Sequence, residues 1–263
     1  MPSDAVLNEA DRLIGEFEKN SNPKPAFEKI ERKEVVVGLR MRIRNPFTIY
    51  QGQTGLCGPT AVIYGLALHN PIGYVQLVAD LYDKGEGLLG KWTLKPCLDL
   101  KRYALPATSE VPPCDWIPTA SLRDSGNWFF DFQEADPDGG GTKVHEIVAW
   151  MKKAGYTKIT EKAGTIICED AANLQEASKL FDADYNVIMK INADLLAGTG
   201  STWSFRADHF VVLAAPVVED GKTIQTKIFS WGDIYSFPDP ARKLTGELKI
   251  FLKHYYGYIA CQY

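Results

Sequence analysis

The apolar pattern of this chain changes near residue 185, and that change most constrains its fold. Before this point, apolar side chains recur at helical spacing or form runs of helix length. After it, segments rich in β-branched and aromatic residues alternate with turn signals. Helices followed by an antiparallel sheet predict an α+β fold with segregated lobes. The predicted helices are residues 4–18, 59–70, 73–83, 143–154 and 170–181, and the predicted strands are residues 185–191, 209–217, 223–231 and 255–261.

The first 45 residues are expected to form a helical extension and linker ahead of the main domain. Residues 21–25, SNPKP, interrupt the chain after the first predicted helix. Residues 34–43 have the composition of a strand, and alternate spacing predicts one solvated face for Arg40, Arg42 and Arg44. The predicted division is therefore an extension at 1–45, which is a candidate contact for a target protein or chaperone, and a main domain at 46–263.

Residues 84–142 are rich in Pro, Gly, Trp and Asp and are expected to be irregular. Loops of this length are commonly functional or disordered, and the aromatic residues in this one favour ordered packing. Two roles remain open for this segment, which are contacts to substrate and packing alone.

Charge and hydropathy exclude several classes of protein. The net charge is −4 and the sequence pI is about 5.7, which argues against a general nucleic-acid binder. No run of 18 apolar residues occurs, so no membrane span is expected. The N-terminus lacks a basic segment followed by an apolar one, so no Sec-type signal peptide is expected. These features predict a soluble protein that is cytoplasmic or exported by a signal-independent route.

The five cysteines are odd in number and form no CxxC pair, so neither a zinc ribbon nor a full disulfide framework is expected. Only an oxidising compartment would pair Cys97 with Cys114. Residues 85–92 approach a phosphate-binding loop but end in Trp92 in place of Ser or Thr. His145 begins an HExxH pattern that fails at Ala149. No metal and no cofactor is predicted.

Cys57 is the predicted nucleophile. It lies between glycine-containing segments where an irregular stretch becomes a helix. The dipole and unpaired N–H groups of a helix N-terminus stabilise a thiolate, which makes the sulfur nucleophilic near neutral pH. Gln51, six residues earlier, is the predicted oxyanion-hole donor together with the Cys57 N–H, and Gln53 is the alternative.

His209 is the predicted base because it opens an apolar strand after a Gly-rich loop. The turn EDGK joins that strand to residues 226–235, so the turn length decides which side chain reaches the imidazole. A three-residue turn with a bulge at Gly221 places Asp233 on the histidine's face, whereas a four-residue turn favours Ser230. We expect Asp233 to orient His209, since a carboxylate also stabilises an imidazolium. Two alternatives remain open, which are Ser230 in this role and a Cys-His dyad without a third member.

These residues resemble the papain-like cysteine protease superfamily. Gln51-Gly52 and Cys57-Gly58 are similar to its Gln–Cys-Gly element, and Ser230-Trp231-Gly232 to the end of its Asn-Ser-Trp-Gly segment. The block around Cys57 also resembles the bacteriocin-processing (double-glycine leader) peptidases and bacterial secreted papain-fold effectors. The resemblance covers residues 50–263 through sparse motifs, and it departs at Phe229, which stands in the place of the family's orienting Asn.

The resemblance implies a papain-like fold with the active-site cleft between a helical lobe and an antiparallel β-sheet lobe. It implies a thiol protease that cleaves a protein or peptide substrate through a thioester, and the effector likeness implies a secreted toxin. Two alternatives use the same fold. One is a deamidase or transglutaminase-type effector, and the other is a binding module without catalysis.

Overall fold

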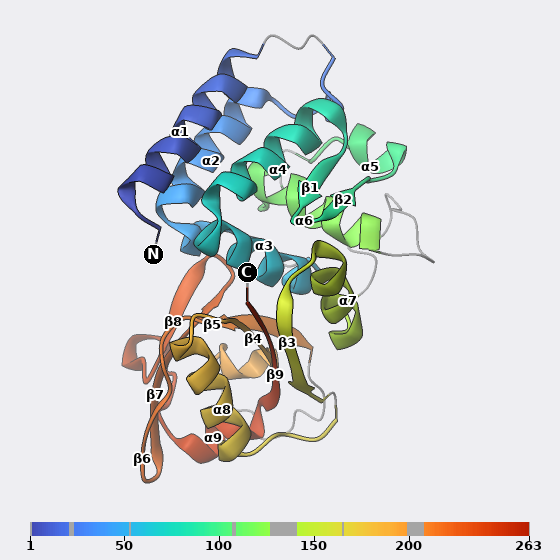
Figure 1. Cartoon of the computed structure of the whole chain (residues 1–263). Helices are drawn as coiled ribbons and strands as arrows, with labels where there is room; N and C mark the ends of the chain where they lie inside the picture. Colours follow the sequence, from blue (N-terminus) through green and yellow to red (C-terminus); the bar gives the residue numbers. More distant parts are fainter. Residues whose placement is uncertain are drawn as a thin grey trace. The chain divides into compact units, whose positions relative to one another are not determined.

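The computed structural model describes residues 2–20, 24–52, 54–106, 109–126, 141–164, 166–198 and 208–262. The chain forms two compact units, Met1–Gly155 and Tyr156–Tyr263. The first is mainly helical and the second contains a mostly antiparallel sheet, so the predicted α+β class is confirmed (Figure 1). The chain does not divide after residue 45, because the first two helices pack within the first unit.

The first unit is a set of packed helices with one small hairpin. Helix α3 is buried from Cys57 to Ala67, so it forms the centre of this unit. Helix α1 buries Ala10, Ile14 and Phe17 along one stripe and packs against α2 and α4. The elements are α1 (Asp4–Lys19), α2 (Arg32–Arg44), a 3-10 turn (Pro46–Thr48), α3 (Cys57–His69), α4 (Pro71–Lys84), β1 (Gly87–Leu89), β2 (Trp92–Leu94), α5 (Leu98–Arg102), α6 (Pro113–Gly126) and α7 (Val144–Ala154).

The predicted strand at 34–43 is wrong, because this segment forms helix α2. Its β-branched residues suggested a strand, yet Val35, Val36, Leu39 and Ile43 are buried at helical spacing. The expected solvated arginine face is also absent, because Arg42 is buried. Tertiary packing of this face therefore outweighs local strand propensity.

Residues 84–142 are less irregular than predicted. They contain the β1–β2 hairpin and helices α5 and α6. Helix α6 continues through Pro118, which together with Pro112 and Pro113 obscured its pattern in the sequence. The part at 127–140, with four of the aromatic residues expected to pack, lies outside the described residues.

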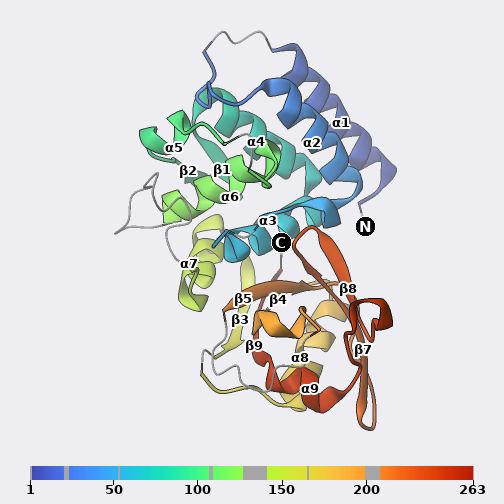
Figure 2. The same cartoon turned by 180° about the vertical axis from the view of Figure 1, so that it is seen from behind.

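The second unit is a sheet ordered β3-β9-β4-β5-β7-β6, with β8 paired to β7, and every pairing is antiparallel. Figure 2 shows α9 beside β7 and β9 from behind. The elements are β3 (Thr157–Ala163), α8 (Ala171–Asp182), β4 (Asn186–Ile191), a 3-10 turn (Ala193–Leu195), β5 (His209–Leu213), β6 (Val218–Asp220), β7 (Thr223–Ser230), β8 (Asp233–Phe237), η3 (Pro240–Arg242), α9 (Leu248–Lys253) and β9 (Tyr255–Gln262).

One face of this sheet has its own hydrophobic core. Val187, Met189 and Ile191 alternate along β4 and pack with Leu174 of α8 and Phe251 of α9. Both helices therefore cover the same face. The four predicted strands are confirmed, whereas β3, β6 and β8 were not predicted.

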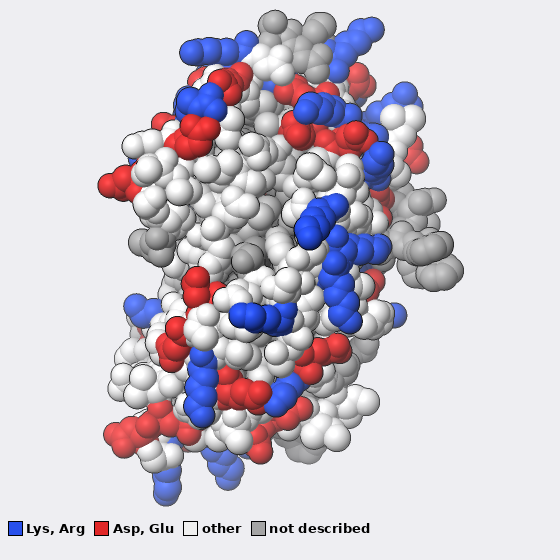
Figure 3. All heavy atoms as spheres, viewed as in Figure 1, with Lys and Arg blue, Asp and Glu red and all other residues white. Residues whose placement is uncertain are grey.

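No helix among the described residues is long and apolar enough to cross a membrane. Acidic and basic side chains occur close together at both ends of the face drawn in Figure 3. This mixed pattern agrees with the small net charge.

Candidate active site

His209 is the first residue of β5, opposite Ile191 of β4, and is 5% exposed. The apolar residues that follow it in β5 are all buried, so packing holds the strand in place. The histidine is therefore held at the start of this strand. Burial lowers the pKa of His209 to about 4. The ring is therefore neutral at pH 7, which is the state that a general base requires.

Ser230, and not Asp233, contacts the imidazole. His209 Nε2 and Ser230 Oγ are 2.6 Å apart. When Nε2 carries the proton and donates a hydrogen bond to Ser230 Oγ, Nδ1 keeps its lone pair and can act as a base. The expected hydrogen bond from His209 to Asp233 is absent, because the Asp233 carboxylate bonds to the Arg242 guanidinium and accepts from the Ile234 N–H.

The register of the sheet explains this correction. Val212 pairs with Phe229, and continuing that register toward the start of β5 brings His209 opposite Gly232 with Ser230 on the diagonal. Both turns considered from the sequence are wrong, because Asp220 pairs with Thr223 across a two-residue loop. The pairing then shifts by two residues across 214–217, the segment that contains Pro216.

Trp231 covers the histidine from a strained turn. Ser230 pairs with Asp233, which leaves Trp231 and Gly232 as a two-residue loop with φ values of +45° and +70°. Positive φ at both positions is the type I′ pattern that suits strand twist, but it costs a bulky residue roughly 1–2 kcal/mol. The Trp231 ring stacks on His209, with centroids 4.4 Å apart and an interplanar angle of 18°.

Cys57 is the first residue of α3, after Leu56, whose carbonyl accepts from the Thr60 N–H at 2.8 Å. The predicted helix-start setting is therefore present, although Cys57 is only 6% exposed. Gly58 serves close packing, since a Cβ there would lie 2.5 Å from Thr142 Cγ2.

Gln51 lies in the segment that leads into α3 and is buried. Its carbonyl accepts from the Thr54 hydroxyl at 2.6 Å. Gly52 takes a φ of +62° directly after it. The alternative donor Gln53 lies outside the described residues.

A buried ion pair holds this segment. Asp115 of α6 accepts from Arg42 Nε at 3.1 Å and Nη2 at 2.6 Å, and from the Tyr50 N–H at 3.0 Å. Tyr50, the residue before Gln51, is thus linked through Asp115 to helices α2 and α6. Burial raises the pKa of Asp115, while Arg42 opposes that effect.

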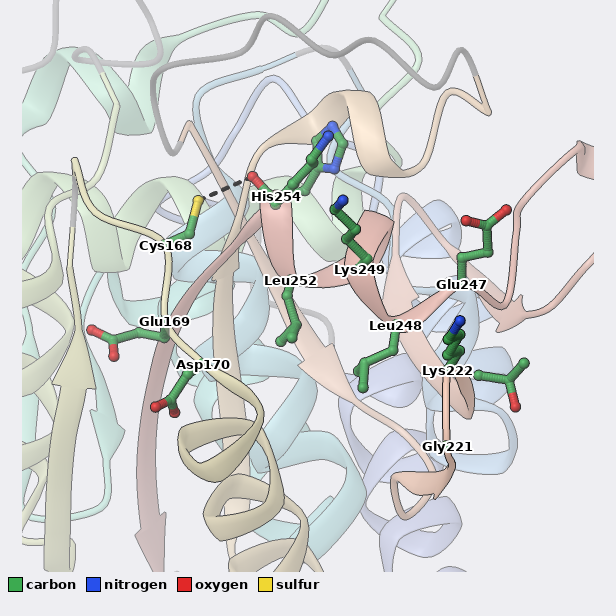
Figure 4. A pocket seen from close by; sticks show the side chains of 12 residues that line it. Cys168, Glu169, Asp170, Gly221, Lys222, Glu247, Leu248, Lys249, Leu252 and His254 are labelled. Carbon is green, nitrogen blue, oxygen red and sulfur yellow. Dashed lines mark hydrogen bonds between the residues drawn. The ribbon is translucent and has the colours of Figure 1, made fainter.

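A cavity of about 1050 Å³ lies in the second unit around α9 (Figure 4). It is at the Thr223 end of β7, whereas Ser230 ends the same strand beside His209. Cys168 and His254 line it, but the Cys168 thiol donates to the Lys253 carbonyl and His254 Nδ1 lies 2.9 Å from the Ile250 carbonyl. This cysteine also lacks a helix-start setting, because α8 begins at Ala171.

The structure therefore brings Ser230 and Trp231 to His209 and places Gln51 just ahead of the helix that Cys57 begins. Cys57 and Gln51 belong to the first unit, and His209 to the second. No group of three or more His, Cys, Asp or Glu side chains in the described ranges is arranged to hold a metal ion. All five cysteines are described, and none forms a disulfide.

Comparison with known proteins gives no relative from which to infer function. The chain matches no protein-family model, no curated protein and no solved structure. The functional argument therefore rests on the residues themselves.

Proposed function

We propose that this protein is a cysteine-nucleophile hydrolase, a papain-like thiol peptidase with Cys57 as nucleophile and His209 as base. The observation that carries the proposal is the environment of His209. A buried neutral imidazole, bonded at Nε2 to Ser230 and covered by Trp231, presents Nδ1 as its remaining basic atom.

The reacting pair in the proposed mechanism is Cys57 Sγ and His209 Nδ1. His209 takes the thiol proton as sulfur attacks the acyl carbon, and the carbonyl oxygen becomes an oxyanion. The Cys57 N–H and the Gln51 amide donate to this oxygen. Collapse breaks the C–N bond, His209 returns the proton to the leaving amine, and water then hydrolyses the thioester to restore the thiol.

The test is mass spectrometry of a mixed proteome incubated with the wild type and with Cys57→Ala. Cys168→Ala is the matched control, because it removes an exposed thiol from another setting. We expect new peptide termini with the wild type and the control but none with Cys57→Ala. Cleavage that persists in Cys57→Ala would contradict the proposal.

Two other outcomes would each replace the peptidase proposal. A Cys57-dependent gain of about 1 Da without cleavage, the difference between an amide and an acid, would indicate a deamidase acting through the same thioester chemistry. No change in any protein would indicate a binding module.

A further inference from the structure

The turn Ser230–Asp233 carries both contacts to His209, so whatever holds this turn also sets the position of the imidazole. Ser230 supplies the hydrogen bond and Trp231 supplies the stacked ring. Trp231 adopts a backbone conformation that bulky residues rarely take. Such conformations persist only where the surrounding structure supports them.

Arg242 contacts the strand that leaves this turn at three points. Its guanidinium bonds to the Asp233 carboxylate, Nη1 donates to the Ile234 carbonyl at 3.3 Å, and Cζ lies 4.6 Å from the centroid of the Tyr235 ring. A planar guanidinium can make an ion pair and a stacked contact together, which an ammonium cannot reproduce.

The backbone of Arg242 is itself anchored. Asp239 Oδ1 accepts from the N–H groups of Ala241 and Arg242 at 3.1 and 3.3 Å. Asp239 also pairs with Leu244 through two backbone hydrogen bonds of 3.0 and 2.9 Å. The guanidinium therefore extends from a fixed point toward β8.

The contacts continue from Arg242 to the histidine through aromatic rings. Tyr235 meets Trp231 edge-on, with centroids 6.3 Å apart and an angle of 70°, and Trp231 stacks on His209. Arg242 thus reaches His209 along two routes, one through Asp233 at the end of the turn and one through the edge-on contact of Tyr235 with Trp231.

We propose that Arg242 is a positioning residue for His209, acting through Asp233 and Tyr235 on the Trp231–Gly232 turn. Its importance for catalysis rests on the function proposed above, but the position of the imidazole is measurable without any substrate. Asp233 then supports the histidine indirectly, through Arg242 and the turn.

The experiment compares Arg242→Ala and Arg242→Lys with the wild type by NMR titration of ¹³C-labelled histidines, using His209→Gln to assign the signal. Lys162→Ala is the matched control, because it breaks an exposed ion pair with Glu176 in the same unit, away from the turn. Thermal unfolding of each variant is recorded alongside.

In Arg242→Ala the Trp231 ring should be held less firmly over His209, so water reaches the imidazole more easily. The pKa of His209 should therefore rise toward its ordinary value by about one unit. The ring-current shift from Trp231 should shrink together with this change. Arg242→Lys keeps the charge beside Asp233 but loses the planar contact. The pKa of His209 in this variant should therefore lie between those of the wild type and Arg242→Ala. Lys162→Ala should leave the His209 titration unchanged.

A purely structural role for Arg242 predicts a lower Tm with an unaltered His209 titration, and that result would overturn the inference. If the pKa of His209 is the same in Arg242→Lys as in Arg242→Ala, the planar contact of Arg242 with Tyr235 carries the effect. That result would support the route through Tyr235. Failure of the proposed function is recognised separately, as a wild type that cleaves nothing although its His209 titration responds to Arg242.

Discussion

His209 and Ser230 share a hydrogen bond of 2.6 Å between Nε2 and Oγ although they are 21 positions apart in the chain. The bond joins the first residue of β5 to the last residue of β7. It assigns the orienting role in the proposed site to a hydroxyl, whereas Asp233, the carboxylate expected there, bonds to Arg242.

Ser230→Ala is expected to lower kcat/KM about tenfold, because a hydrogen bond of this kind contributes about 1–1.5 kcal/mol. Asp233→Ala should lower it less, by about threefold, since an exposed ion pair contributes about 0–1 kcal/mol. The measurement is kcat/KM on a peptide found in the proteome digest, with circular dichroism to verify folding. A greater loss in Asp233→Ala than in Ser230→Ala would contradict the assignment.

The depressed pKa of His209 makes stability depend on pH. Between pH 6.5 and about 4, the unfolded state binds a proton at this residue that the folded state does not, so the free energy of unfolding falls as pH falls. Above about pH 7.5 both states are almost wholly deprotonated at this residue, so the slope vanishes. At pH 5 the loss is about 2 kcal/mol by this linkage.

The check on this pH effect is urea unfolding at pH 7.5 and pH 5, with His209→Gln as the matched variant. The glutamine does not titrate, so the variant should lose about 2 kcal/mol less than the wild type between the two conditions. Equal losses in both proteins would show that His209 titrates normally in the folded state.

Breaking the buried ion pair between Arg42 and Asp115 is expected to destabilise the first unit strongly. Asp115→Ala leaves the Arg42 charge buried without its carboxylate, which costs about 3–5 kcal/mol. Arg40→Ala, on the same helix, removes only exposed pairs with Glu18 and Asp11 and should cost less than about 1 kcal/mol. Chemical denaturation of the two variants checks this difference, and similar losses would show that burial of the pair has little effect.

The rates of thiol labelling should differ among the five cysteines according to their surroundings. Burial raises the pKa of Cys261 to about 12 and that of Cys114 well above its usual value, so both should react slowly. Cys168 is exposed, so iodoacetamide should also reach its thiol.

The labelling experiment uses iodoacetamide at pH 7 followed by peptide mapping, in the wild type and in Cys168→Ser. In the variant, Cys57 should be modified first, and its modification should abolish activity. Modification of Cys114 or Cys261 ahead of Cys57 would count against the nucleophile assignment.

Local pattern was enough to predict much of this fold. Helices α1, α3, α4, α7 and α8 follow from apolar spacing and from turn residues such as Gly155. Strands β4, β5, β7 and β9 follow from runs of β-branched and aromatic residues. The same reasoning placed Cys57 at a helix start and His209 at a strand start, because each depends only on neighbouring residues.

Long-range packing decided the rest. Arg42 is buried because its partner Asp115 lies 73 residues away, and no local spacing reports that pairing. The contact of His209 with Ser230 depends on a two-residue loop and on a register shift across 214–217, and a change of one residue in register moves a side chain to the opposite face. Arg242 had no signal in the sequence, since its proposed role depends on Tyr235 and Trp231 lying between it and the histidine. The spacing of apolar residues indicates whether a segment is a helix or a strand. Which side chains meet depends on how those elements pair, and that pairing exists only in the folded chain.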